Sequence, residues 1–184
     1  MPTLEGQLTE LKVLELGANR IRRITGLDAF PNLKHLWLGR NKITEVSGLN
    51  SLEHLEILAL PSNRLTELGG LDGLPALTEL YVSHNAITKL QGLDNLTKLQ
   101  TLDVGSNRIQ QLEGITQLQQ LEEFWCGENK IDGFDSLQQL AKLTQLQTVY
   151  LERNPIQESN QYMIQILGLL PTLSQLDATP ISRR

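Results

Sequence analysis

The sequence predicts an α/β solenoid, in which one short unit is stacked many times along a single parallel sheet. Two observations lead to this prediction. Leucine makes up 38 of the 184 residues, whereas Phe, Trp and Tyr together account for only 4%. In addition, a nine-residue pattern that ends in asparagine recurs with a shift of 22 residues along most of the chain. Self-similarity at a fixed period of this size is the signature of repeat architectures.

The repeated unit reads Leu-x-x-Leu-x-Leu-x-x-Asn, which is the pattern of a leucine-rich repeat. We expect seven repeats over residues 11–154, a partial repeat over residues 1–10 and a C-terminal cap over residues 155–184. A buried asparagine can bond the unpaired backbone groups of the turn that it closes, so the asparagine column is interpreted as structural. Its members are Asn19, Asn41, Asn63, Asn85, Asn107, Asn129 and Asn154.

Each part of the repeat predicts one element. The Leu-x-Leu alternation has period two, which predicts a short strand with its leucines inward, and stacked strands form a concave parallel sheet. After each asparagine the apolar spacing becomes three, as at Leu65, Leu68 and Leu71. This spacing predicts 3₁₀-like turns or short helices on the convex side. A glycine seven residues past the asparagine is expected to provide an unusual backbone conformation; these are Gly26, Gly48, Gly70, Gly92 and Gly114.

The last segments depart from the regular repeat. The convex segment that starts at Phe134 is three residues longer, and Ser136 replaces the glycine, so we expect a helical turn there. No clear cap is expected at the N-terminal end. After Pro155, a helix followed by a partial repeat over residues 173–177 is expected to cover the C-terminal end of the solenoid.

Composition excludes several classes of function. The net charge of −5 argues against binding of a phosphate backbone, which requires clustered Lys and Arg. There is no apolar run near 18 residues that could span a membrane, and we see no secretory signal. Cys126 is the single cysteine and cannot form an internal disulfide, which favours a reducing, intracellular compartment.

Function is sought at the middle position of Leu-x-Leu, because the fold leaves it free to vary. This column holds four of the five Trp and Tyr residues of the chain. With nearby carboxylates it predicts a binding stripe for a basic protein partner on the concave face. The candidate residues are Glu15, Trp37, Tyr81, Asp103, Glu123, Trp125 and Tyr150. Alternatively, the aromatic residues only pair across strands. We favour the partner site because Trp37 and Tyr81 lie two strands apart.

Catalysis finds little support. His35, His54 and His84 fall on the concave face, the convex wall and a turn, with no nucleophile placed to use them and no metal-ligand spacing. The adjacent Glu122 and Glu123 point to opposite sides of a strand. We therefore expect no enzyme activity, no cofactor, no metal ion and no small-molecule substrate.

Three segments resemble the leucine-rich repeat regulatory subunit of protein phosphatase 1. They are Leu-Glu-Glu-Phe-Trp at residues 121–125, Val-Tyr-Leu-Glu-Arg-Asn-Pro at residues 149–155 and Leu-Pro-Thr-Leu-Ser-Gln-Leu-Asp-Ala-Thr at residues 170–179. The resemblance implies a non-enzymatic, nuclear and cytoplasmic regulator that holds the phosphatase catalytic subunit on its concave face. By position, it implies contacts from Glu15, Trp37, Asp103, Glu123, Trp125 and Tyr150. Members of that family carry several more repeats before the first one here, so the chain corresponds to their C-terminal half to two-thirds.

Other classes of protein remain as alternatives. A general scaffold, such as the leucine-rich subunit that pairs with a spliceosomal RNA-binding protein, would hold a partner helix on the concave face. Ala59 would leave a gap for that helix. A bacterial adhesion protein is disfavoured by the missing signal peptide, and an enzyme comes last.

Overall fold

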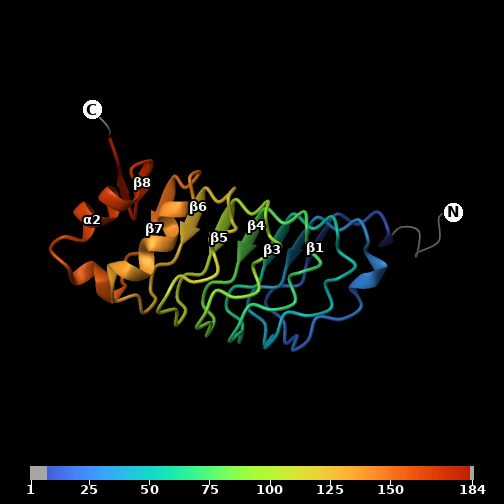
Figure 1. Cartoon of the computed structure of the whole chain (residues 1–184). Coiled ribbons are helices and arrows are strands. Elements are labelled where there is room, and N and C mark those ends of the chain that lie inside the picture. The colour runs from blue at the N-terminus through green and yellow to red at the C-terminus, as the bar shows by residue number, and fades with distance from the viewer. Residues whose placement is uncertain (1–7, 183–184) are drawn as a thin grey trace.

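The computed structural model describes residues 8–182 and shows a curved solenoid in which the first and last repeats lie at opposite ends (Figure 1). One sheet contains all nine strands of these residues, in chain order. The first eight are parallel and the ninth is antiparallel to the eighth. The strands are β1 Val13–Glu15, β2 His35–Trp37, β3 Ile57–Ala59, β4 Glu79–Tyr81, β5 Thr101–Asp103, β6 Glu123–Trp125, β7 Thr148–Tyr150, β8 Gln175–Leu176 and β9 Thr179–Pro180. The predicted leucine-rich repeat solenoid is confirmed.

The register of the sheet follows the repeat. Leu14 lies beside Leu36, and Leu36 lies beside Leu58, so each repeat places the same position at the same height. From β2 to β7 the middle residue of each strand is fully buried, while its two neighbours face the concave side. The pleat of the strand produces this division, because successive side chains point to opposite faces.

The convex wall consists largely of 3₁₀-type turns, as predicted. In one repeat the amide of Leu52 donates to the carbonyl of Leu49 at 2.9 Å, and that of Leu55 donates to Leu52 at 3.0 Å. Such a turn is long enough to form the 3₁₀ helix η1 (Leu27–Ala29). The longer convex segment forms the nine-residue η2 (Phe134–Lys142), so the expected helical turn is a 3₁₀ helix.

The glycine column provides left-handed backbone. Gly70 has φ +71° and Gly92 has φ +78°. A Cβ on Gly92 would lie 1.9 Å from the carbonyl oxygen of Leu68, so the two neighbouring turns pack without room for a side chain. Ser136 needs no such conformation, because it lies inside η2.

The asparagine column is a hydrogen-bond ladder, as predicted. Asn107 Nδ2 donates to the carbonyl of Val104 at 2.9 Å and to that of Val82, in the preceding repeat, at 3.1 Å. Its Oδ1 accepts from the amide of Ile87 at 3.0 Å. Each buried asparagine therefore ties two repeats together and satisfies backbone groups that would otherwise be unpaired.

The C-terminal end is covered by η3 (Pro155–Glu158), α2 (Tyr162–Leu169), β8 and β9. Asp177 has a specific part in this cover. In earlier repeats the amide two residues after the strand centre bonds the next strand, as Cys126 N does to Tyr150 O. At the end of the sheet the amide of Leu151 donates instead to Asp177 Oδ1 at 2.7 Å, and the Tyr162 hydroxyl donates to Asp177 Oδ2 at 2.9 Å. A carboxylate oxygen of Asp177 thus takes the place of the strand carbonyl that accepts this amide in earlier repeats.

The N-terminal end is less well covered. Leu11, Leu14 and Leu16 are only half-buried, and Val13 is 44% exposed. Most of the expected partial repeat over residues 1–10 lies outside the described residues, as do residues 183–184 of the expected cap. In the described part of the chain no helix is long and apolar enough to cross a membrane.

Candidate protein-binding surface

The pleat and the register bring the middle position of every strand into one row on the concave face. Glu15 lies beside Trp37, Tyr81 beside Asp103, and Trp125 beside Tyr150. Glu123 stands two residues before Trp125 on the same face. The structure therefore places all seven predicted site residues on this face.

Four aromatic side chains form a continuous row of ring contacts, which we call the aromatic ladder: Trp37, Tyr81, Trp125 and Tyr150. The ring centroids of Trp37 and Tyr81 are 6.4 Å apart with planes inclined by 20°, a stacked arrangement. Tyr81 meets Trp125 at 6.4 Å and 65°, and Trp125 meets Tyr150 at 6.0 Å and 66°, both edge to face. These geometries are favourable for aromatic pairs.

The ladder corrects one argument made from the sequence. We expected the two-strand separation of Trp37 and Tyr81, about 9.6 Å along the sheet, to keep them apart. Instead, the two side chains lean toward each other across the small Ala59, which is only 2% exposed. The two rings therefore cover Ala59, and the expected gap at this residue is not present.

The ladder is packed but not hidden. Trp37 is 37% exposed, and Tyr81, Trp125 and Tyr150 are half-buried. The indole Nε1 of Trp125 is buried without a hydrogen-bond partner among the described residues. A buried donor that lacks a partner is costly, so this indole is held in place by its ring contacts and not by a hydrogen bond.

Carboxylates surround the middle of the ladder. The Tyr81 hydroxyl donates to Glu79 Oε2 at 2.7 Å, and Asp103 Oδ1 accepts the amide of Gly105 at 2.9 Å. Burial, together with the bond to Glu79 and the negative charges of Glu123 and Asp103, raises the pKa of Tyr81 above its ordinary value of 10.0. Tyr81 therefore remains a neutral donor at neutral pH.

Two residues outside the predicted set support the ladder. Glu79 holds the Tyr81 hydroxyl in place through a hydrogen bond. It could have been found from the sequence, because it lies two residues before Tyr81 and therefore faces the same side of the strand. Gln175 Nε2 donates to the Tyr150 hydroxyl. Nothing in the repeat pattern indicated this second contact, because β8 belongs to the irregular end of the chain.

Other reactive groups do not assemble into a site. Cys126 is fully buried, and burial raises the pKa of its thiol above the ordinary value of 9.0. His35 Nε2 lies 4.0 Å from Glu56, on the concave side of β2. Among residues 8–182 no group of three His, Cys, Asp or Glu side chains is arranged to hold a metal ion.

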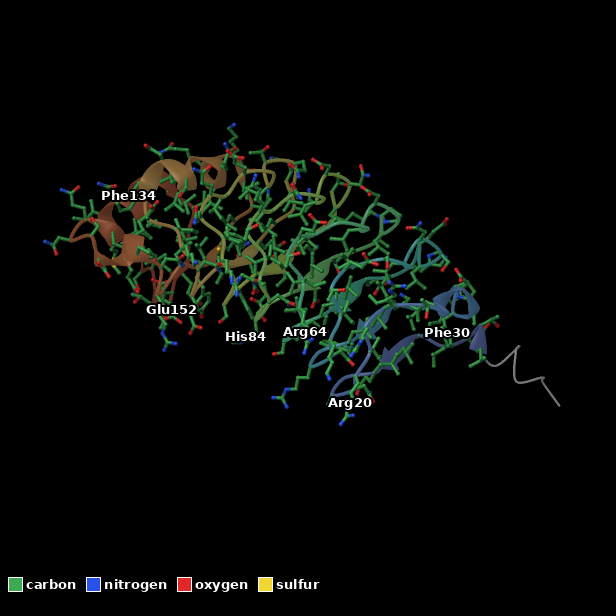
Figure 2. All side chains as sticks on the ribbon, turned by 90° about the horizontal axis from the view of Figure 1, so that it is seen from below. Arg20, Phe30, Arg64, His84, Phe134 and Glu152 are labelled. Carbon is green, nitrogen blue, oxygen red and sulfur yellow. The ribbon has the colours of Figure 1, made fainter. Side chains whose placement is uncertain are left out.

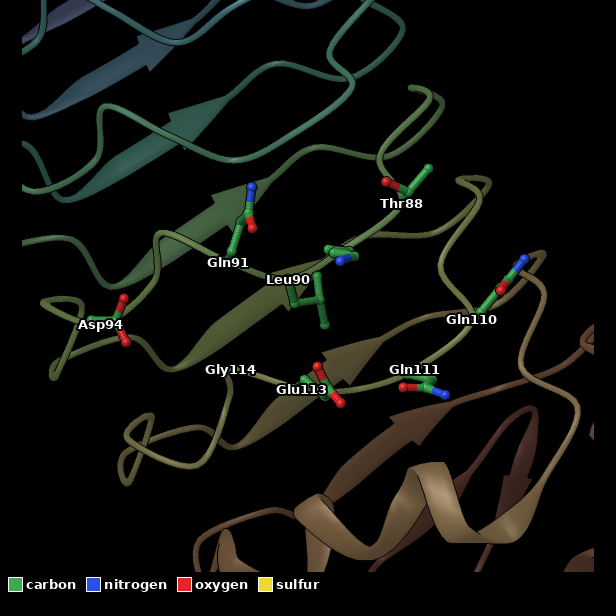
Figure 3. A pocket seen from close by; sticks show the side chains of 9 residues that line it. Thr88, Leu90, Gln91, Asp94, Gln110, Gln111, Glu113 and Gly114 are labelled. Carbon is green, nitrogen blue, oxygen red and sulfur yellow. The ribbon is translucent and has the colours of Figure 1, made fainter.

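A hollow of about 510 Å³ lies on the convex wall between two successive repeats. Thr88, Gln91 and Asp94 line one side, and Gln110 and Glu113 line the other. Figure 3 shows these side chains spread along the turns rather than converging on one point. The aromatic ladder, whose side chains contact one another, is therefore a better candidate for a binding surface than this hollow.

Comparison with known proteins agrees with this architecture. A family model described as "Leucine-rich repeat" matches residues 73–184, which is more than half of the chain. The chain belongs to the leucine-rich repeat family. Two further models, "Leucine rich repeat" and "Leucine Rich repeats (2 copies)", match residues 31–87 and 9–51.

Among curated proteins, the chain is similar to protein phosphatase 1 regulatory subunit 7. It is 59% identical to that protein of Xenopus tropicalis and 53% identical to that of Homo sapiens, over 34 residues in each case. The matched part is 18% of this chain and spans only about a tenth of the relatives, 10% and 9% of their lengths. The resemblance found in the sequence is therefore confirmed, over a short segment.

Solved structures with a similar fold extend over nearly the whole chain. An internalin from Listeria monocytogenes matches 99% of the chain and 52% of its own length, with TM-score 0.79 and 27% identity. A leucine-rich repeat protein from Leptospira interrogans matches 94% of the chain and 44% of its own length, with TM-score 0.79 and 30% identity. Internalin C2 from Listeria monocytogenes matches 95% of the chain and 83% of its own length, with TM-score 0.70 and 26% identity.

Proposed function

We propose that the protein is a non-catalytic regulator that binds the catalytic subunit of protein phosphatase 1 through its concave face. The contacts come from the aromatic ladder with Glu15, Asp103 and Glu123. The regulator acts in the nucleus and cytoplasm. The aromatic ladder and its carboxylates carry the proposal, and the similarity to regulatory subunit 7 names the partner.

The ladder has the physical properties of a binding surface. Trp and Tyr side chains dominate the energetics of protein interfaces, and truncation of one such residue costs roughly 2 to 4 kcal/mol. Ring contacts on both sides hold Tyr81 and Trp125 in place before a partner arrives. Less rotamer freedom is then lost on association, which increases affinity.

The carboxylates determine the kind of partner. Asp103 lies in the row between Tyr81 and Trp125. Glu123 stands two residues before Trp125, and Glu79 two residues before Tyr81, on the same face. Acidic groups next to aromatic faces favour a basic protein surface, through both charge and cation–π contacts. A protein partner with exposed Lys and Arg side chains around an apolar patch satisfies both.

Calorimetric titration of this chain with the phosphatase catalytic subunit tests the proposal. We expect micromolar binding or tighter, about −8 kcal/mol, and Trp125→Ala or Tyr150→Ala should weaken it at least about tenfold. Ile164→Ala is the matched control, because Ile164 is an apolar side chain exposed on α2, away from the concave face. It should leave binding unchanged.

Two results would contradict the proposal. One is the absence of binding by a folded wild-type chain. The other is binding that Trp125→Ala, Tyr150→Ala and Ile164→Ala affect equally, because the interaction would then lie outside the ladder. A thermal melt of each variant separates loss of the interface from loss of the fold.

A further inference from the structure

One long edge of the solenoid carries a row of positive side chains. At this edge each strand ends and the chain turns toward the convex wall. Figure 2 shows Arg20, Arg64, His84 and Glu152 along it. The residue directly after each member of the asparagine column is basic in five of the first six repeats. In chain order this position holds Arg20, Lys42, Arg64, Ala86, Arg108 and Lys130. With Arg40, which precedes Asn41, the cations Arg20, Lys42, Arg64 and Arg108 form what we call the basic rim.

The backbone holds the basic rim in a fixed register. The amides of Lys42, Arg64 and Arg108 each donate to a carbonyl of the preceding repeat at 2.8 Å. Arg40 has left-handed backbone, with φ +56°, and its amide bonds the next repeat at 2.8 Å. Because the same bonds recur in every repeat, this position recurs at the strand spacing of about 4.8 Å. Arg64 and Arg108 lie two spacings apart, because Ala86 stands between them.

The rim cations are not neutralised by the chain itself. Within residues 8–182 none of the five forms an ion pair or a side-chain hydrogen bond, whereas Lys34 pairs with Glu56 and Arg153 with Glu128. The loops of the first five repeats contain no Asp or Glu; they are residues 17–20, 39–42, 61–64, 83–86 and 105–108. Four rim cations are exposed and Lys42 is half-buried. Their charges therefore face solvent without a counter-ion from the protein.

The N-terminal part of the chain, which carries three of the five rim cations, has an excess of positive charge. Residues 8–44 contain seven Lys and Arg against three Asp and Glu, although the whole chain carries a net charge of −5. Charges in water are screened over about 8 Å at physiological ionic strength. A ligand at the rim therefore interacts mainly with the rim cations and not with the acidic residues of later repeats.

We propose that the basic rim binds a short acidic peptide segment of a partner protein, laid in extended conformation along the edge. This goes beyond the proposed function, because the rim is distinct from the concave face. From Arg20 to Arg108 the rim spans four repeat intervals, about 19 Å, which about six extended residues cover. Arginine is well suited to this role, since its guanidinium binds a carboxylate through two parallel hydrogen bonds.

An acidic peptide fits the rim better than a nucleic acid does. Single-stranded nucleic acids are held by aromatic side chains on which bases stack, and the five rim loops contain no Trp, Tyr or Phe. A longer polyanion would also continue past the rim to Glu152, at the C-terminal end of the same edge (Figure 2). A short segment avoids that repulsion.

Fluorescence anisotropy with a labelled peptide of about six glutamates tests the proposal. We expect saturable binding at about 50 mM salt that weakens several-fold at about 200 mM. The double variant Arg40→Glu/Arg64→Glu should lower the affinity about tenfold or more. Lys98→Glu/Lys142→Glu is the matched control, because it changes the net charge equally at exposed positions of the convex wall. It should change the affinity less than about twofold.

Several results would overturn the proposal. The first is no saturable binding at low salt. The second is an equal loss in the control, which would assign binding to net charge. The third is tighter binding of a thymidine oligonucleotide, or of vesicles that contain phosphatidylserine, lost in the same rim variant. The fourth is a dimer in sedimentation that the rim variant abolishes. Arg40→Gln/Arg64→Gln repeats the test without charge reversal. The phosphatase titration is independent of all these results.

Discussion

Replacement of one buried residue of the asparagine column tests whether these asparagines stabilise the stacking of neighbouring repeats. In Asn107→Ala the side chain loses its donor contacts to Val82 O at 3.1 Å, Val104 O at 2.9 Å and Gly105 O at 3.1 Å. It also loses the bond that Oδ1 accepts from Ile87 N at 3.0 Å. The two protons of the amide group are shared among the three carbonyls, so about three hydrogen bonds are removed.

The expected destabilisation follows from these contacts. Three net hydrogen bonds at about 1 kcal/mol each give about 3 kcal/mol. The buried amide of Ile87, left without a partner, adds about 1 kcal/mol. We therefore expect Asn107→Ala to lower the free energy of unfolding by about 4 kcal/mol, a large part of the stability of a domain this size.

Asn19→Ala is the matched control, at the N-terminal end of the asparagine column. Asn19 is exposed, and it donates only to Leu16 O at 3.1 Å and Gly17 O at 3.0 Å, within its own repeat. Water can replace these bonds, so we expect a cost below about 1 kcal/mol. Urea unfolding, followed by circular dichroism, gives both free energies when the slope with denaturant is unchanged. Equal costs for the two variants, or a cost for Asn107→Ala below about 1.5 kcal/mol, would refute the reasoning.

Three further predictions concern the backbone, the cap and the buried thiol. Gly92→Ala should lower the stability by about 3 kcal/mol or more in thermal melts, while Gly69→Ala, with nothing within 4 Å of its Cβ position, should be nearly neutral. Burial and Asp177 raise the folded-state pKa of Tyr162 above 10.0, so its contribution to stability is complete below about pH 10 and is lost as the pH rises further. Tyr162→Phe should flatten that decline in urea unfolding at alkaline pH. The Cys126 thiol should react slowly with a disulfide reagent in the folded protein and at the rate of a free thiol in urea.

Most of the fold could be predicted from the sequence because the apolar spacing within each repeat is enough to define its strand and its turns. The period of two around Leu58 defines a strand, and the period of three from Leu65 defines the convex turns. The recurrence of asparagine and glycine at fixed positions then places every strand beside the next. Stacking of identical units leaves only one register in which all leucines are buried.

The candidate surface could be predicted only in part. The alternation of the strand placed Trp37 and Tyr81 on the same face and in the same column, which the structure shows. Whether their rings touch depends on rotamers and on the size of the residue between them. The stacking over Ala59 is therefore a tertiary feature, and the argument from strand separation was wrong on this point.

The ends of the solenoid depend on tertiary structure for a similar reason. Asp177 occupies the position that Tyr150 has in the preceding strand, so the pattern alone would place it facing solvent. In the structure its carboxylate bonds Leu151 N and the Tyr162 hydroxyl instead. No local pattern encodes this, because the unpaired amide exists only once the last repeat has no successor.

The sequence by itself thus determined the repeat, the strand register, the buried columns and the side chains that face the concave surface. Each of these follows from periodicities that act within one repeat or between neighbours. Only the tertiary structure decided the ring contacts of the aromatic ladder, the closing bonds of Asp177 and the absence of counter-ions along the described basic rim. These depend on the directions of side chains from different repeats, which are fixed only when the whole solenoid is assembled.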